Sequence, residues 1–410
     1  MRILFLSQYF PPEPGAPAAR VSELATAWAR AGEQVTVLTA MPNHPSGVVP
    51  AGYRGRRVVR ESREGVDVVR TWIYAAPNSG RVRRSLAYAS FAASAVVSGL
   101  WHTPQPDVVI ATSPQLLCAC AGRLAALLRR APFIFEVRDL WPESIVAVGA
   151  LPARHPVVRA LTVVEESLYR SARAIVVVTD SFRERLVGRG FSADKIHVVK
   201  NGVDLGRFAP APRDTPLRRE LGWQDMFVVG YVGTHGMAHA LDTVLDAAKR
   251  LGQRPDVRFL LVGDGAERSR LEQRVSTERI ENVRLLGSVA RDRISEVYAT
   301  LDAALVTLRR SELFTSVLPS KIFEIAAMAR PILLSVDGEA RALVEASGGG
   351  VFVPPEDVGA MVDALVHWIE EPAVGIRMGL AGRSYVAAHF DRESLARAYL
   401  EILRRSVSVA

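Results

Sequence analysis

Cysteine is scarce in this sequence of 410 residues, and its two cysteines, Cys118 and Cys120, stand in one apolar helical stretch. A metal site needs further Cys or His ligands at suitable spacing, and none are nearby. Two small buried thiols are therefore the favoured interpretation. Nothing in the cysteine usage indicates an oxidising compartment.

Long hydrophobic runs are also missing. The first apolar stretch ends at Leu6, before polar Ser7 and Gln8, so it resembles a buried strand rather than a signal peptide. The uncharged segment 85–101 is short for a membrane span and rich in Ala and Ser. A buried or membrane-facing helix is the better interpretation. We expect a cytoplasmic protein, with peripheral contact to the inner face of the cytoplasmic membrane as an open alternative.

Acidic residues are outnumbered, and the net charge is +8, carried mostly by arginine. Such an excess favours anionic partners, which include nucleic acid, anionic lipid and phosphorylated small molecules. No nucleic-acid-binding motif or aromatic interleaving accompanies the arginines, which argues against nucleic acid. About half of the residues are hydrophobic, and Gly and Pro are spread out, which is typical of a folded globular chain.

The apolar runs predict two α/β domains, because short strand-like runs alternate with helical patterns and the series then restarts. The junction contains the turn Asn201-Gly202 and later prolines. We therefore predict an N-terminal Rossmann-like domain over 1–204, a C-terminal one over 205–385, and a closing helix over 386–410 that returns to the N-terminal domain. The strands expected are 3–6, 35–39, 66–71, 108–111, 133–137 and 175–178 in the first domain, and 227–231, 259–262, 283–286, 303–307 and 332–335 in the second.

Three loops after the C-terminal strands contain glycine, and a ligand of such sheets binds beyond the carboxyl ends of the strands. Their glycines suit a close backbone approach to phosphate, but each also suits a plain tight turn. The second loop resembles a dinucleotide fingerprint without its complete spacing. The third could offer backbone groups to a base edge and is weak by itself. The residues concerned are Gly233, Thr234, His235 and Gly236 in the first loop, Gly263 and Gly265 in the second, and Val289 in the third.

A fourth segment, Leu318-Pro319-Ser320-Lys321-Ile322-Phe323-Glu324, precedes an apolar strand. Ser320 is placed to cap a helix, and Lys321 in its first turn would add a charge to a phosphate. Glu324 lies one turn further on the same face, where a carboxylate accepts two ribose hydroxyls. A serine cap and a glutamate that only support the helix are an equal alternative.

Two N-terminal loops are unusual. Residues 8–16 join the first strand to its helix, and Gly15 would let that backbone approach the cleft expected between the domains. Residues 138–144 follow a strand and gather four chemically active side chains: Arg138, Asp139, Trp141 and Glu143. Recognition is one interpretation, and an internal Arg138–Asp139 pair is the other.

Together these segments resemble glycosyltransferase family 4, with the two-domain GT-B fold and a cleft between its domains. The opening Ile-Leu-Phe-Leu-Ser-Gln-Tyr-Phe-Pro-Pro-Glu, the Asn201-Gly202-Val203-Asp204 junction, the Val262–Gly265 loop and the 319–324 helix start occur in matching order. The segments 138–144 and 336–339 are similar to the branch that builds bacterial surface polysaccharides, including N-acetylfucosamine transferases of O-antigen assembly.

The resemblance implies a retaining transfer from a nucleotide diphosphate sugar, without a metal or other cofactor. It implies that Glu324 binds the ribose, that the Gly233 loop, Lys321 and the helix amides hold the diphosphate, and that Gly15 approaches it as well. As catalytic residues we predict Arg138, Asp139, Glu143 and Lys321. As donor-binding residues we predict Gly15, Gly233, Thr234, His235, Gly236, Gly263, Gly265, Val289, Leu318, Pro319, Ser320, Lys321 and Glu324. As acceptor-binding residues we predict Tyr9, Asn43, His44 and Trp141.

The sequence departs from the family pattern at three points. Ser316 stands where many members carry the first of two glutamates, Thr234 and His239 stand where they carry a phosphate-binding Arg and Lys, and Arg138 replaces a frequent His. Charge neutralisation must therefore come from elsewhere, and Lys321 and Arg138 are the candidates. His239 is either a weaker substitute or a helix-surface residue.

The acceptor is expected at the N-terminal domain. An arginine run over 54–63 and further arginines at 81–84 lie beside the uncharged helix, which suits an anionic membrane surface and a polyprenyl-diphosphate-linked acceptor. A solvated basic face is the alternative. A nucleotide-sugar epimerase and a non-catalytic nucleotide-sugar binder remain as other classes. A UDP-linked N-acetylated hexosamine or deoxyhexosamine is the expected donor by resemblance alone.

Overall fold

The computed structural model describes residues 1–13, 15–44, 46–76, 81–143, 146, 151–152 and 154–408. Ser144, part of the predicted 138–144 motif, lies outside these residues. The chain divides into two compact units, one formed by Met1–Lys200 with Glu393–Ala410 and the other by Asn201–Arg392. The boundaries thus lie at 200/201 and 392/393, where the sequence suggested 204/205 and 385/386.

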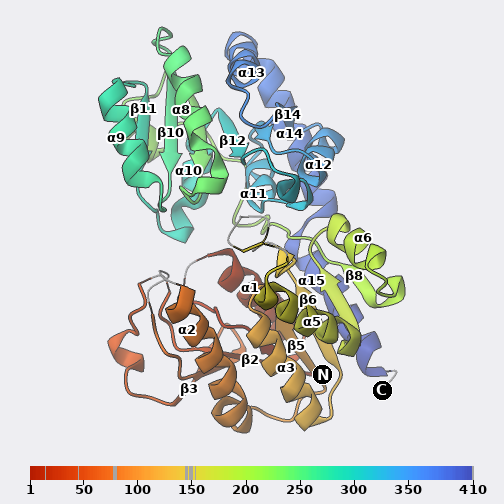
Figure 1. Cartoon of the computed structure of the whole chain (residues 1–410). Helices are drawn as coiled ribbons and strands as arrows, with labels where there is room; N and C mark the ends of the chain where they lie inside the picture. The colour runs from red at the N-terminus through yellow and green to blue at the C-terminus, as the bar shows by residue number, and fades with distance from the viewer. Residues whose placement is uncertain are drawn as a thin grey trace. The chain divides into compact units, whose positions relative to one another are not determined.

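The first unit is built on an eight-stranded sheet in the order β3-β4-β2-β1-β5-β6-β7-β8 (Figure 1). Every neighbouring pair is parallel except β3–β4, which is antiparallel. The strands are β1 Arg2–Leu6, β2 Gln34–Ala40, β3 Val58–Arg63, β4 Val66–Thr71, β5 Val108–Thr112, β6 Phe133–Val137, β7 Ala174–Val177 and β8 Ile196–Val198.

Apolar side chains bury both faces of this sheet, which is why its central strands are continuous hydrophobic runs. All five residues of β5 and of β6 are buried. The helices are α1 Ala16–Arg30, α2 Arg81–Ser94, α3 Leu116–Arg129, α5 Pro156–Ser171, α6 Asp180–Gly188 and α15 Arg392–Ser408. Helix α2 continues through a π-helical turn, Ala95–Gly99, and a 3₁₀ turn, Leu100–His102.

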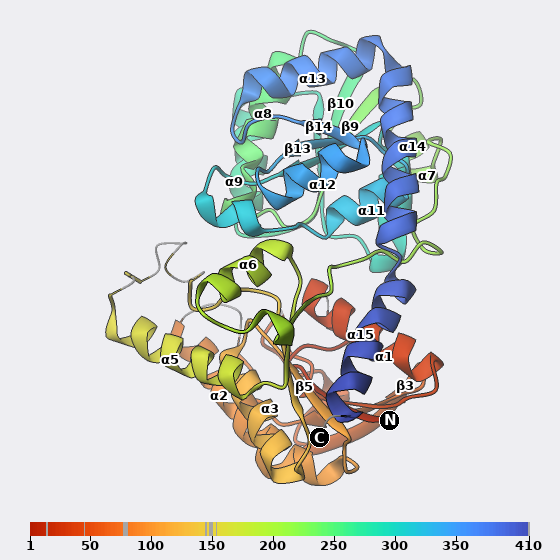
Figure 2. The ribbon, with the colours of Figure 1, turned by 90° about the vertical axis from the view of Figure 1, so that its right-hand side faces the viewer.

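Helix α15 completes the core of the first unit although it comes from the far end of the chain. Figure 2 shows it, in blue, beside the red α1. The indole N–H of Trp28 donates to the Ala396 carbonyl at 2.9 Å, and Tyr399 packs edge-on against the Trp28 ring at 5.2 Å. Leu400 and Leu403 belong to the same buried cluster.

The second unit has a six-stranded, wholly parallel sheet in the order β11-β10-β9-β12-β13-β14. Its strands are β9 Phe227–Val232, β10 Val257–Val262, β11 Val283–Leu286, β12 Ala303–Thr307, β13 Ile332–Ser335 and β14 Gly350–Phe352. Its helices are α7 Pro216–Glu220, α8 Leu241–Arg250, α9 Arg268–Glu278, α10 Ile294–Thr300, α11 Lys321–Ala327, α12 Glu339–Ser347, α13 Val358–Glu370 and α14 Pro372–His389.

Helix α14 explains why the second boundary lies later than the sequence suggested. It packs against α11, where a Cβ on Gly379 would lie only 2.1 Å from the Ala329 carbonyl oxygen. Phe390, just beyond α14, contacts Phe323 with ring centres 4.9 Å apart. These contacts keep the segment 372–390 in the second unit.

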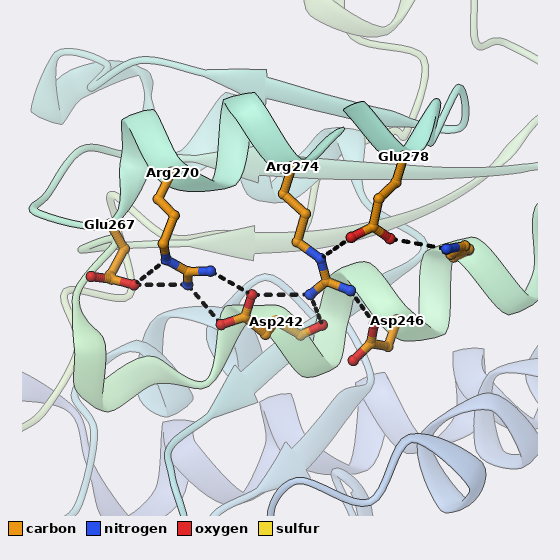
Figure 3. A network of polar contacts seen from close by, with 7 residues as sticks. Asp242, Asp246, Glu267, Arg270, Arg274 and Glu278 are labelled. Carbon is orange, nitrogen blue, oxygen red and sulfur yellow. Dashed lines mark hydrogen bonds and ion pairs between the residues drawn. The ribbon is translucent and has the colours of Figure 1, made fainter. Parts of the chain in front are cut away.

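An ion-pair network joins α8 to α9 in the second unit (Figure 3). Arg270 pairs with Asp242 and Glu267 at 2.7 Å, and Arg274 pairs with Asp242 and Glu278 at 3.0 and 2.8 Å. Helix α8 follows the first glycine loop, and α9 follows the second. The ion pairs between the two helices therefore also hold the two loops close to each other.

Each sheet has one point where its strand order reverses, between β1 and β5 in the first unit and between β9 and β12 in the second. Ligands of open α/β sheets bind beyond the carboxyl ends of the strands at such points. The residues that follow β1, β5, β9 and β12 are therefore the first to consider as site residues.

Candidate functional site

The two glycine loops of the second unit are bonded to each other beyond the ends of their strands. The Gly233 amide donates to the Val262 carbonyl, and the His235 amide donates to the Asp264 carbonyl, both at 2.9 Å. The Glu267 amide in turn donates to the His235 carbonyl at 2.9 Å. The pairing of β9 and β10 thus continues into the loops.

This close pairing accounts for the glycines of the second loop. Gly263 and Gly265 have φ of 146° and 157°. A Cβ on Gly263 would lie 1.8 Å from the Gly233 carbonyl oxygen, and one on Gly265 would lie 2.4 Å from the His235 carbonyl oxygen. The tight-turn interpretation therefore explains these two glycines without a ligand.

Gly233 differs, because its absent side chain leaves room for another residue. It has φ of 147°, and a Cβ there would lie 2.7 Å from Nζ of Lys321. The Lys321 ammonium also lies over the Tyr231 ring, 3.8 Å from its centre. The first glycine loop, the end of β9 and the start of α11 thus meet at one ammonium group.

Lys321 is held without a partner of opposite charge at ion-pair distance among the described residues. Removal from water lowers the pKa of its ammonium to about 7, and only the more distant Glu324 charge opposes this shift. An amine in this state gains most from an anion placed beside it, because the anion restores the charged form. The geometry therefore provides an anion-binding position.

Two histidines surround the same Tyr231 ring, each with its ring centre 6.1 Å away. His235 is fully buried, and neither ring nitrogen has a hydrogen-bond partner among the described residues. Burial lowers the pKa of both histidines, that of His239 to about 4. His239 is half-buried, and its Nδ1 lies 3.3 Å from the Gly236 carbonyl, so it is not a plain helix-surface residue.

Glu324 is fixed by a tyrosine from α10. The buried Tyr298 hydroxyl donates to Oε2 of Glu324 at 3.2 Å. Glu324 is half-buried and follows Lys321 by one helical turn, as the spacing predicts. One carboxylate oxygen is thus held by the protein in a fixed orientation.

The predicted cap is wrong, because the Ser320 side chain makes no cap hydrogen bond. Ser320 has helical dihedrals, φ −60° and ψ −25°, so its hydroxyl cannot reach back to the first free amides. The Ile322 amide donates instead to the Pro319 carbonyl at 3.1 Å. Leu318 is buried, Thr234 is exposed, and Val289 is half-buried in the loop after β11.

In the first unit, polar side chains gather after β1, β5 and β6. A small hollow with about 10 Å³ of free volume is lined by Ser7, Gln8, Tyr9, Pro17, Thr112, Ser113, Pro114, Gln115 and Arg138. Burial and the nearby Tyr88 side chain raise the pKa of the Tyr9 hydroxyl, and the Tyr9 ring lies 5.2 Å from the His44 ring. Arg138 and Tyr9, two of the predicted residues, are therefore brought together here.

Other predicted residues of this unit have structural contacts. Asn43 is buried, and its side-chain amide donates to the Met41 carbonyl at 2.9 Å. Trp141 packs against the core. Glu143 pairs with Arg185 on α6 and with Arg189 just beyond it, at 3.2 and 3.4 Å.

Gly15 directly precedes α1 and has φ of 111°. Asp139 follows Arg138 directly in the sequence. The Asp139 carbonyl accepts the Ser113 hydroxyl at 3.3 Å. Nη1 of Arg138 is buried and has no hydrogen-bond partner among the described residues, and the Asp139 charge acts on the Arg138 guanidinium.

Sequence reasoning missed four residues of these groups: Gln8, Gln115, Tyr231 and Tyr298. Gln8 and Gln115 directly follow β1 and β5, so the strand-end rule alone could have found them. The two tyrosines lie inside a strand and a helix, where nothing in the spacing distinguishes them from core residues.

The comparisons with known proteins agree with this arrangement. Residues 15–202 match a model of the glycosyl transferase 4-like domain, and residues 226–371 match one of glycosyl transferases group 1. The chain belongs to glycosyltransferase family 4. It is a glycosyltransferase of the GT-B fold.

Relatives match this chain over part or nearly all of its length. It is 27% identical to the putative colanic acid biosynthesis glycosyl transferase WcaI of Escherichia coli, over 98% of this chain and 100% of that protein. It is 28% identical to a GDP-mannose-dependent alpha-mannosyltransferase of Mycobacterium tuberculosis, over 68% and 70%. The structure of HepE from Anabaena in complex with UDP-glucose has a TM-score of 0.73 at 20% identity, covering 99% of this chain and all of that one.

Two further findings concern the described residues only. None of their helices is long and apolar enough to cross a membrane. They contain no group of three or more His, Cys, Asp or Glu side chains that could hold a metal ion.

Proposed function

We propose that this glycosyltransferase transfers a sugar, with retention of anomeric configuration, from a nucleotide diphosphate donor to an acceptor in surface-polysaccharide synthesis. The observation that carries the proposal is the desolvated Lys321 ammonium, which has no described partner at ion-pair distance and lies at the carboxyl end of β9. The diphosphate of the donor would supply the missing counter-charge.

The donor would be held by the second unit. The Gly233 loop and Lys321 would bind the diphosphate, and Glu324, oriented by Tyr298, would accept the ribose hydroxyls. In support, the solved relative HepE is in complex with UDP-glucose, and a curated relative depends on GDP-mannose. A UDP-linked N-acetylated hexosamine or deoxyhexosamine is our first choice of donor, and no metal would be needed.

The reaction would break the bond between the anomeric carbon and the diphosphate oxygen and form one to the acceptor hydroxyl oxygen. The nucleoside diphosphate would leave, and one of its phosphate oxygens would take the acceptor proton. Stabilising the charge on the leaving group is then the protein's main contribution. No strong base is required on the acceptor side.

A panel of UDP-, GDP- and dTDP-sugars, screened by thermal shift, tests the donor. Nucleotide release that depends on an added acceptor would support a transferase. A sugar isomerised in the absence of acceptor would indicate an epimerase. Donor binding without acceptor-dependent release would leave a non-catalytic binder.

The acceptor would be a polyprenyl-diphosphate-linked sugar at an anionic membrane. Helices α2 and α3 of the first unit contact each other. These helices and the two turns that continue α2 carry large exposed apolar side chains: Leu86, Val97, Trp101, Leu124, Leu127 and Leu128. Arg60 of β3 donates to the His102 carbonyl, which brings the arginine run next to Trp101. Exposed apolar residues with a basic border suit an anionic bilayer.

A further inference from the structure

A groove of the second unit lies beyond the carboxyl ends of three neighbouring strands, β12, β13 and β14. It has about 490 Å³ of free volume, within the range of about 300–1,000 Å³ that ligand pockets occupy. Its lining comes from residues within the segments 309–315, 336–341 and 352–355, each of which lies at or after the end of one of these strands. None of the lining residues belongs to the donor site proposed above. The groove is therefore a second place at this edge of the sheet with room for a ligand.

One side of the groove is the loop after β13, which contains the segment 336–339 that is similar to the surface-polysaccharide branch. Gly338 has φ of 80°, and a Cβ there would lie 2.0 Å from the Thr315 carbonyl oxygen. The Gly338 amide donates to the Asp337 carboxylate at 2.8 Å. The loop thus packs on the 3₁₀ turn Glu312–Ser316, and Asp337 stays exposed at the groove. This side of the groove is fixed by backbone packing.

A flat wall of the groove is formed by Arg341 of α12 and Phe352 at the end of β14. The guanidinium carbon of Arg341 lies 4.2 Å from the centre of the Phe352 ring. Arg341 also pairs with Glu345 at 2.8 Å and with Asp337 at 3.6 Å, so its charge already has partners. A guanidinium stacked on an aromatic ring is weakly hydrated and presents a flat surface. Such a wall suits the face of a ring.

Two other arginines of the groove, Arg309 and Arg310, have no such partners. Both are exposed, and neither guanidinium has an ion-pair partner within the part of the chain that the structure describes. The Arg310 guanidinium donates to the Pro355 carbonyl at 3.1 Å, and the Glu356 carboxylate accepts the Arg310 amide at 3.0 Å. Single exposed arginines are ordinary on protein surfaces, but these two border one groove. They are therefore placed to bind one anion together.

Two carboxylates of the groove set the other requirement. Glu312 and Asp337 are both exposed and line it. An ionised carboxylate only accepts hydrogen bonds, so each favours a hydroxyl of the ligand. With the three arginines, the lining carries three positive and two negative charges, which leaves a net charge of +1. A nucleoside diphosphate would bring several negative charges close to both carboxylates. A sugar with a single carboxylate matches the arginines, the acids and the flat wall at once.

We propose that this groove binds a sugar residue that carries one carboxylate. The carboxylate binds Arg309 and Arg310, and one face of the sugar ring packs on Phe352. The sugar hydroxyls donate to Glu312 and Asp337. That this sugar belongs to the polysaccharide made by the enzyme rests on the proposed function, whereas the binding of an acidic sugar does not. The second unit would then hold glycan as well as donor.

The test uses the full chain saturated with UDP, so that the nucleotide position is filled. The probes are methyl glucuronide and methyl glucoside, which differ only in the carboxylate, and glucose 6-phosphate. Dissociation constants are measured by ligand-observed NMR for the wild type, Arg309→Gln/Arg310→Gln and Phe352→Leu. The control Arg250→Gln/Arg377→Gln removes two exposed arginines, on α8 and α14, that do not line the groove. Circular dichroism and melting curves check folding.

We expect methyl glucuronide to bind the wild type about tenfold more tightly than methyl glucoside, which corresponds to one charge-assisted hydrogen bond. Arg309→Gln/Arg310→Gln loses this preference, and the control keeps it. Phe352→Leu weakens both glycosides by a similar factor, because both lose the aromatic face. The affinity for UDP is the same in all four proteins.

Equal binding of the two glycosides by the wild type, or a preference that survives Arg309→Gln/Arg310→Gln, overturns the proposal. Tighter binding of glucose 6-phosphate than of methyl glucuronide also overturns it, since the anion would then be a phosphate. A loss of UDP affinity in the double variant overturns it too, because the two arginines would then serve the donor. Glu324→Ala tests the donor proposal separately through UDP affinity, so the two failures are distinguishable.

Discussion

The Lys321 ammonium lies 3.8 Å from the centre of the Tyr231 ring, in space that Gly233 leaves free. Cation–π contact and burial together keep this amine in place without a described carboxylate at ion-pair distance. The arrangement has a consequence for pH, because the amine loses its charge within the physiological range.

We expect UDP-glucose affinity to fall roughly tenfold between pH 6.5 and 8.5, since the Lys321 pKa of about 7 lies far below its usual 10.5. The donor carries constant charge in this range. His239, with a pKa of about 4, stays neutral throughout, and burial also lowers the pKa of His235. Burial raises the pKa of Tyr231 above its usual 10, so this residue does not titrate between pH 6.5 and 8.5 either.

Calorimetry of Lys321→Met checks this prediction. The variant should bind UDP-glucose more weakly, and its affinity should depend less on pH. Lys249 on α8 is an exposed amine that pairs with Glu278 on α9, so Lys249→Met should keep the wild-type pH profile. An unchanged slope in Lys321→Met would assign the pH dependence to another group.

Replacing Glu324 by Ala should weaken nucleotide binding by about 1.5–3 kcal/mol, since hydrogen bonds to a charged group are lost. Tyr298→Phe should act in the same direction but less, because it frees the carboxylate without removing it. Calorimetry with UDP measures both, and the exposed Glu281→Ala serves as the control. Unchanged affinity in Glu324→Ala would remove that residue from the site.

Gly263→Ala should destabilise the second unit by about 2–4 kcal/mol, because its Cβ meets the Gly233 carbonyl at 1.8 Å in a backbone conformation that L-residues avoid. Gly222, with φ of 68°, has open space around it. Gly222→Ala should therefore cost only about 1 kcal/mol. Urea unfolding compares the two, and equal losses would mean that the loops can separate at little cost.

Asp242→Asn should lower stability by about 1 kcal/mol at neutral pH, a modest amount because its two ion pairs are partly exposed. Hydrogen bonds from Arg270, and then from Arg274, hold the pKa of Asp242 below its usual 3.8. Its contribution is thus present above pH 3.8 and is lost as the pH falls through the folded-state pKa. Urea midpoints of wild type and variant should converge from pH 6 towards 3, with Glu272→Gln as a control of smaller effect.

Trp101→Glu combined with Leu127→Glu should abolish flotation with anionic liposomes, because both side chains are more than 70% exposed on the apolar surface of the first unit. Val187→Glu, an exposed apolar residue on α6, is the matched control. If the wild type floats equally with neutral and anionic lipids, the arginines beside the apolar surface do not contribute to binding. If the wild type does not float at all, this surface does not bind membranes.

The sequence predicted every buried strand of four or more residues, because these strands are continuous apolar runs. It missed β3, whose Arg60, Glu61 and Arg63 suit an edge position with antiparallel pairing. It also missed β8 and β14, which are three residues each and too short to show a period.

The site was predictable where loops follow strands and unpredictable where side chains from distant elements meet. Spacing within one helix made Lys321 and Glu324 candidates, and the family resemblance favoured them over a purely structural role. Their partners Tyr231 and Tyr298 are 90 and 26 positions before those residues, respectively, in the printed numbering. Gln8, Gln115 and Arg138 come close together only when β1, β5 and β6 are aligned in the sheet, so their positions in the sequence do not reveal this group.

The position of α15 also constrains the order in which the chain can fold. The second unit is an insertion between two parts of the first, and the two crossings pair where the Val203 amide donates to the Phe390 carbonyl at 3.0 Å. Trp28 finds its hydrogen-bond acceptor only at Ala396. During synthesis the first unit therefore stays incomplete until the whole second unit has left the ribosome, so the domain that begins first is finished last.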